Sequence, residues 1–295
     1  MKISTTQAQT RIRQLLNRDK QDSSGTEYDY RQALLIIANH LNAFITEYGD
    51  KNGLDPTQVN QKINNWDLQQ WKQAVSQVTM SELSPDARAR YRYYSQTAGI
   101  NRNYLISAII GVAFLASTQK QETRVSNRID LDVGDVKKAY KVTKKRNKQT
   151  NKAVAENYKK WSSDLWLKND AMVAQVQSAV NKHLSSTLTH RDITKMFDYS
   201  NARSQSVQAV KAMTSSTIRL LRTETARATH EIMMSAFKVQ HVAMVEMVVE
   251  PDVCPKCDEI REQGPFNLDN VPDIPIHPNC RCSLIPYDGD VAMSF

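Results

Sequence analysis

The spacing of apolar residues through the first 240 positions is the feature that most limits the fold. Over residues 27–48 apolar side chains recur at intervals of three and four, as on one face of a helix. The same spacing returns over residues 161–184 and again from about residue 215 to residue 236. The chain has only eight glycines and few alternating stretches before residue 240. We therefore expect a mainly α protein with an extended helical body.

Polar and proline-containing stretches predict where these helices begin and end. Asp55 and Ser84 each precede a proline, a combination typical of an N-cap followed by the first helical residue. A break is expected near Gly99, and another over residues 185–192. After the second break, one helix is expected over residues 193–213 and a further one from about Ser215.

The longest apolar run, residues 105–116, is about a dozen residues long, whereas a bilayer requires roughly 20. We read it as a buried helix and expect no membrane contact. The first twenty residues lack an apolar run followed by a small-residue cleavage site, so we expect no secretory signal and a cytoplasmic origin.

The pattern changes after residue 240. Residues 242–249 are rich in valine and methionine and stop before Pro251, which predicts a strand apolar on both faces. Residues 282–287 are a second extended candidate. The expected organisation is an N-terminal helical region (1–125), a basic segment (126–160), a second helical region (161–240) and a small two-stranded, cysteine-rich α+β module (241–295).

All four cysteines lie in this last module. They form a Cys-x-x-Cys pair, Cys254 and Cys257, and a Cys-x-Cys pair, Cys280 and Cys282. Two close-spaced thiol pairs on separate turns suit tetrahedral zinc, and His277 is a possible replacement for one of the second pair. In a reducing compartment such a cluster more often binds metal than forms disulfides, although metal-free thiols or a disulfide remain alternatives. A catalytic zinc is disfavoured, because the nearby Glu259 and Glu262 fit a solvated acidic turn.

Three stretches resemble the C-terminal signature of the phage Mu F-like minor head proteins, also called phage head morphogenesis proteins. They are LLRTETARATHEIMMSAFK, then EPDVCPKCDEIREQGPF, then IPIHPNCRCSLIPY. Residues 161–177 also resemble the helix that precedes them in that family, and residues 101–109 resemble an earlier one more weakly. A glycine of the family pattern is missing before His190.

The resemblance implies a structural, non-enzymatic protein of a tailed bacteriophage. Such a protein lies inside the capsid in few copies, associated with the portal protein and with other capsid or scaffolding proteins. It acts in head assembly or on the fate of the DNA, after synthesis in the host cytoplasm. The runner-up is a zinc-dependent nucleic-acid-processing enzyme, for which no constellation of His, Glu or Asp can be assembled. A host DNA-binding regulator would need a recognition helix, and no helix-turn-helix pattern stands out.

The net charge of +8 is unevenly distributed. Residues 137–160 hold ten lysines and arginines against Glu156, whereas residues 246–295 hold ten acids against three bases. A basic segment of this density can be a solvated helix, but its self-repulsion favours a polyanionic partner. Inside a capsid that partner is the double-stranded genome, contacted without sequence preference. The expected phosphate contacts are Lys144, Lys145, Arg146, Lys148 and Lys152.

The helix around residues 219–231 carries three arginines, two glutamates and a histidine. An ion pair between Glu224 and Arg227 is the expected arrangement, with a phosphate or acidic partner as the alternative. His230 is expected to be packed or at the surface rather than catalytic. The triplet at residues 190–192 matches part of a kinase loop, but the other kinase motifs are absent, so we discard that interpretation.

Overall fold

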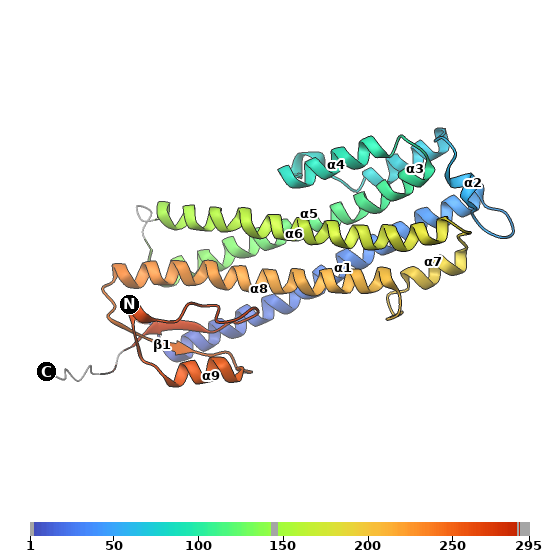
Figure 1. Cartoon of the computed structure of the whole chain (residues 1–295). Helices are drawn as coiled ribbons and strands as arrows, with labels where there is room; N and C mark the ends of the chain where they lie inside the picture. The colour runs from blue at the N-terminus through green and yellow to red at the C-terminus, as the bar shows by residue number, and fades with distance from the viewer. Residues whose placement is uncertain (1–2, 143–146, 288, 290–295) are drawn as a thin grey trace. The chain divides into compact units, whose positions relative to one another are not determined.

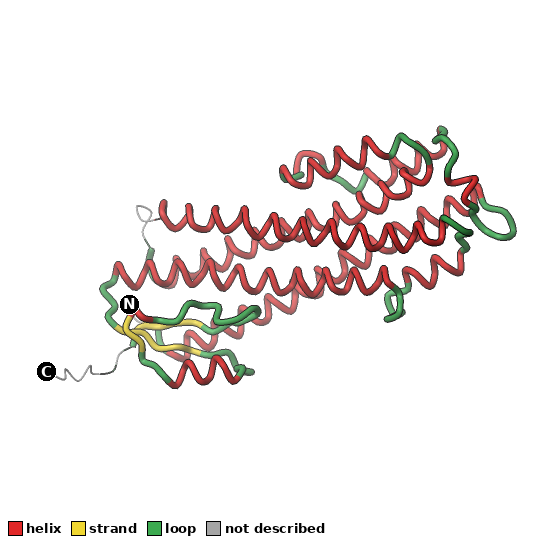
Figure 2. The backbone as a smooth tube through the Cα atoms, in the orientation of Figure 1, coloured by secondary structure: helices red, strands yellow, loops and turns green. Residues whose placement is uncertain are grey.

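The computed structural model describes residues 3–142, 147–287 and 289, with the side chains of 147–157 excepted. The described chain is mainly helical, and its strands lie in the C-terminal part (Figure 2). This confirms the expected fold class. The predicted helices over 27–48 and 161–184 are also confirmed as parts of longer helices.

The chain forms two compact units, each assembled from segments far apart in sequence. Unit 1 comprises residues 1–23, 124–161 and 218–295, and unit 2 comprises residues 24–123 and 162–217. The long helices contribute to both units; they are α1 (Thr5–Tyr48), α5 (Arg102–Ala139), α6 (Asn147–Leu184) and α8 (Gln205–Val239), labelled in Figure 1. The linear division into four regions stays a prediction.

Within the described residues, unit 2 contains five short helical elements, and two of them start at the predicted caps. They are α2 (Pro56–Val59), α3 (Asn65–Val75), the 3-10 turn η1 (Met80–Glu82), α4 (Pro85–Thr97) and α7 (His190–Phe197). The Asp55 carboxylate accepts from the backbone N–H groups of Thr57 and Gln58, at 2.7 and 3.0 Å. The Ser84 hydroxyl accepts from Ala87 N–H at 3.3 Å. Both caps are confirmed, and so is the break near Gly99.

The prediction of one helix over residues 193–213, followed by another from about Ser215, is wrong. Helix α7 ends at Phe197, and α8 then runs without interruption through Ser215. The Asp198 side chain accepts from Ser200 N–H at 2.9 Å and forms a local turn there. The Ser204 hydroxyl, which accepts from the backbone N–H of Val207, starts α8 instead.

The predicted break before α7 has a capping box in place of the missing glycine. Thr189 and Asp192 each accept from the other's backbone N–H, at 3.1 and 3.2 Å. This reciprocal pair explains the position of the triplet at residues 190–192, which begins a helix.

The core of unit 2 includes the apolar run of α5. Leu105, Ile109 and Phe114 are at most 2% exposed, as expected for a buried helix. Polar contacts cross this core, since Thr118 donates to Asn169 at 2.8 Å. Among the described residues, no helix combines the length and apolarity needed to cross a membrane.

Unit 1 contains an antiparallel sheet of strand order β2-β1-β3. The strands β1 (Met244–Val248) and β3 (Ser283–Pro286) confirm the two predicted ones, but β2 (Phe266–Asn267) makes the described sheet three-stranded rather than two-stranded. A two-residue strand is too short to show alternation. A 3-10 turn, η3 (Leu268–Asn270), follows it. Helix α9 (Pro255–Glu262), which contacts β1, was also not predicted (Figure 1).

The start of α1 packs on this sheet. Ala8 and Ile12 form one buried cluster with Val248 of β1 and Ile285 of β3, and each is at most 4% exposed. Because burying such side chains is the main favourable term in folding, this cluster attaches the N-terminal helix to the C-terminal module within unit 1.

Candidate metal centre

Two segments of unit 1 bring the predicted metal ligands together. The first is the start of α9, where Cys254 is the N-cap and Cys257 lies in the first turn. The second is the loop from His277 to Cys282, which leads into β3. A cap sulfur and a first-turn sulfur lie on the same end of a helix, which is why Cys-x-x-Cys pairs suit metal binding.

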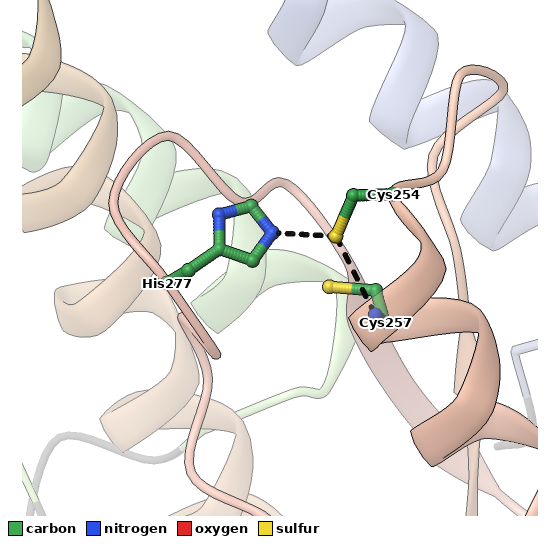
Figure 3. Close-up of side chains that lie close together, drawn as sticks. All are labelled: Cys254, Cys257 and His277. Carbon is green, nitrogen blue, oxygen red and sulfur yellow. Dashed lines mark hydrogen bonds between the residues drawn. The ribbon is translucent and has the colours of Figure 1, made fainter.

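The donor atoms form two overlapping groups. In one, atoms of Cys254, Cys257 and His277 lie within 4.8 Å of one another; in the other, Cys257, Cys280 and Cys282 do. Figure 3 shows the first group, with His277 facing Cys254. The Cys254 Sγ to His277 Nε2 distance is 3.1 Å, and the Cys257 Sγ to Cys280 Sγ distance is 3.8 Å. A tetrahedral ion with bonds of about 2.3 Å to sulfur has S–S edges of ~3.8 Å.

The imidazole of His277 is oriented for metal binding. Its Nδ1 lies 2.8 Å from the carbonyl oxygen of Pro278, which can only accept, so Nδ1 carries the proton. Nε2 then presents its lone pair to the cluster. Histidine ligands in proteins are usually fixed by a hydrogen bond of this kind.

Hydrogen bonds divide the cysteines into two thiolate-like and two thiol-like members. The backbone N–H of Cys257 lowers the pKa of Cys254, and the Cys282 thiol lowers the pKa of Cys280 to about 5. Burial raises the pKa of Cys257 to about 12, and the hydrogen bond to Cys280 raises the pKa of Cys282. The cluster therefore brings sulfur donors and an imidazole nitrogen close together, and it can hold a metal ion.

Arg281 lies between two of these cysteines and belongs to a different site. Residues alternate in direction along extended backbone, so the guanidinium points away from its two neighbours. It is 2% exposed. Its Nε lies 2.8 Å from Asp19 Oδ2, a second nitrogen contacts Asp19 Oδ1, and a third donates to the Thr225 hydroxyl at 2.6 Å.

Asp19 of α1 is the centre of a buried ionic network. Besides Arg281, it contacts Arg128 of α5 at 3.1 Å and Arg222 of α8 at 3.3 Å. Arg222 also contacts Glu250, which accepts from the backbone N–H of Arg281 at 3.3 Å. Charges removed from water are tolerated when they are paired and hydrogen-bonded, as they are here.

Two expectations for α8 are confirmed, and the one for Glu259 and Glu262 is confirmed for their exposure but not for the expected turn. The Arg227 guanidinium donates to both oxygens of Glu224, at 2.6 and 2.8 Å, so the expected ion pair is confirmed. His230 is packed, at 7% exposed. Glu259 and Glu262 are exposed on α9.

The predicted nucleic-acid contacts fall in the part of the chain that the structure does not describe. Lys144, Lys145 and Arg146 lie outside the described residues, as do the side chains of Lys148 and Lys152. Exposed lysines flank that gap, including Lys138, Lys141, Lys159 and Lys160. Both tyrosines of the segment are engaged elsewhere: Tyr140 packs edge-on against Phe237, and Tyr158 packs against Trp161.

Comparison with known proteins yields no match: no protein-family model, no curated protein and no solved structure is significantly similar to this chain. The sequence alone indicated the five metal-ligand candidates. It did not indicate Asp19, Arg128 or the partner of Arg281, because nothing local distinguishes one aspartate of an amphipathic helix from another.

Proposed function

We propose that this chain is a structural minor capsid protein of a tailed bacteriophage, acting in head morphogenesis. It would lie inside the head near the portal protein, and it would bind genome DNA without sequence preference. The support is the sequence resemblance described above, together with the way its separate motifs fit into one site.

The observation that carries the proposal is the convergence of the three resembling stretches. The first lies within α8, the second contains Cys254 and Cys257, and the third contains His277 and the Cys-Arg-Cys triplet. Arg281 donates to Thr225 of α8, and the backbone N–H of Asn279 lies 3.3 Å from the Thr223 hydroxyl. Motifs that share contacts are better explained as one inherited module than as three chance likenesses.

The metal assigned to this module is structural zinc. Cys257 belongs to both donor groups, and we infer that Cys254, His277 and Cys280 complete the set, with the Cys282 thiol donating to Cys280. Zinc would supply a rigid cross-link between α9 and the 277–282 loop. We expect about one zinc per chain in protein purified without chelator. Elemental analysis giving well under half an equivalent would remove this part of the proposal.

The DNA contact is assigned to the basic segment. Replacing Lys144, Lys145, Arg146 and Lys148 with glutamine should weaken binding equally for unrelated duplexes and reduce the salt slope by about four at most. The matched control replaces four exposed bases elsewhere: Lys51, Lys62, Arg88 and Lys195. If the two quadruple variants bind alike at every salt concentration in filter-binding titrations, the segment is a solvated helix and not a DNA contact.

The enzyme alternative makes an opposite prediction. A zinc-dependent nuclease would lose metal-dependent cleavage in Cys280→Ala, whereas a structural protein shows no cleavage in either form. The place in the virion is tested separately by electron microscopy of the assembled particle, with antibody labelling of this chain. Label distributed evenly over the capsid, with no enrichment at the portal vertex, would contradict the proposed location.

A further inference from the structure

A groove in unit 1 is a candidate ligand site that is independent of the cysteine cluster and of the DNA proposal. It has a volume of about 520 Å³ and runs between the first half of α1 and the end of α5. Ligand pockets in proteins typically measure about 300–1,000 Å³. The lining residues are Ile3, Thr6, Gln7, Thr10, Arg11, Gln14, Leu15, Arg18, Asp135 and Ala139.

The cations of the groove are unequally paired. Arg18 contacts Asp132 at 2.7 Å and Asp135 at 2.8 Å, so its charge is compensated. Asp132 is further shared with Arg128, at 3.0 Å. The Arg11 guanidinium, in contrast, forms no hydrogen bond or ion pair of standard length with any residue that the structure describes. Its interactions with Asp132 and Asp135 act over longer distances.

Arg11 is also partly removed from water. Burial lowers the pKa of its guanidinium, and this effect exceeds the attraction from Tyr140, Asp132 and Asp135. An arginine side chain nevertheless stays protonated at neutral pH. A partly desolvated cation without a hydrogen-bonded anion is costly, and an incoming anion would relieve that cost.

The other lining residues indicate what the uncharged part of such an anionic ligand should be. Ile3, Leu15 and Ala139 supply apolar surface, while the polar side chains Gln7 and Gln14 lie at the exposed edge. Asp135 also faces the groove, so a doubly charged phosphate would be repelled more strongly than a singly charged carboxylate. We propose that this groove binds a carboxylate carried on a short apolar body, with the Arg11 guanidinium holding the carboxylate and Ile3, Leu15 and Ala139 contacting the body.

The test uses the full chain and octanoate as the probe, measured by isothermal titration calorimetry. Arg11→Gln should weaken octanoate binding roughly tenfold to a hundredfold, the range expected for losing hydrogen bonds to a charged group. Octanamide, which has the same body without the charge, should bind the parent protein as weakly as octanoate binds Arg11→Gln. The matched control is Arg13→Gln, because Arg13 is exposed on the same helix and does not line the groove.

A second variant separates shape from charge. Thr10→Phe fills the groove from an exposed helix position and leaves Arg11 in place, so it should also weaken binding while circular dichroism stays at the parent level. The inference is overturned if octanoate does not bind the parent at millimolar concentration, or if Arg11→Gln binds it as the parent does. A dipeptide of leucine with a free carboxyl end, compared with its amide, distinguishes a partner chain's end from a small acid as the natural source.

Discussion

Replacing Asp19 by asparagine should destabilise unit 1 much more than an ordinary surface substitution does. The change keeps the shape of the side chain and removes one negative charge at the centre of the ionic network. The side chains of Asp19 and Arg281 are 6% and 1% exposed. Removing one partner of a buried ion pair leaves the other charge uncompensated and typically costs about 3–5 kcal/mol.

The three arginines around Asp19 differ in how many ionic partners they keep when Asp19 is replaced. Arg128 keeps Asp132 and Asp22, and Arg222 keeps Glu250. Arg281 keeps only the Thr225 hydroxyl among the side-chain partners that the structure describes. Most of the cost therefore falls on Arg281, and a loss of about 3 kcal/mol or more in the free energy of unfolding of unit 1 is expected.

Hydrogen exchange followed by mass spectrometry can assign that loss to one unit. Peptides from residues 5–18 and 244–286 should lose protection in Asp19→Asn, while peptides from α3 and α4 stay unchanged. The control is Asp170→Asn in unit 2, which breaks a more exposed pair with Arg90 and should cost about 1 kcal/mol or less. Adding Arg281→Met to Asp19→Asn should recover part of the loss. A cost below about 1 kcal/mol for Asp19→Asn would refute this account of the network.

Three further outcomes are expected. Ile12→Ala removes a side chain that is 1% exposed and should lower the stability of unit 1 by about 2–5 kcal/mol in urea unfolding, with Arg13→Ala as the exposed control. Burial lowers the pKa of His230 below its unfolded value of about 6.5. The unfolded state therefore binds more protons, and stability should fall as pH drops through that range. His230→Gln should flatten this pH dependence of stability, and an unchanged slope would contradict the prediction. Cys282→Ser should retain about one zinc because a hydroxyl can still donate to Cys280, whereas Cys257→Ser should lose it, and elemental analysis of both variants decides between them.

Local patterns predicted the elements whose causes are local. The three-and-four spacing of residues 27–48 and 161–184 placed parts of α1 and α6, and the prolines after Asp55 and Ser84 placed two helix starts. Cysteine spacing, with the histidine next to the second pair, identified the side chains of the candidate metal cluster. These features depend on residues a few positions apart, so they can be read along the chain.

The errors arose where short-range bonds compete or where distance in sequence is large. The turn at Asp198 interrupted a helix that the apolar pattern favoured, and the strand at Phe266 is too short to show a pattern. The pairing of Arg281 with Asp19 spans 262 positions. A buried aspartate on α1 has the same local surroundings as an exposed one, so the fold had to be known before its role could be assigned.

The Cys-Arg-Cys stretch connects the two sites of unit 1. Cys280 and Cys282 face the cluster, while Arg281 between them enters the Asp19 network, so one short backbone segment is held from both sides. If zinc occupies the cluster, metal binding and the ion pair each favour the same conformation of this segment. Coupling between two such sites is reciprocal. Asp19→Asn should therefore lower the zinc affinity measured by chelator competition, and zinc removal should reduce hydrogen-exchange protection of α1 around Asp19.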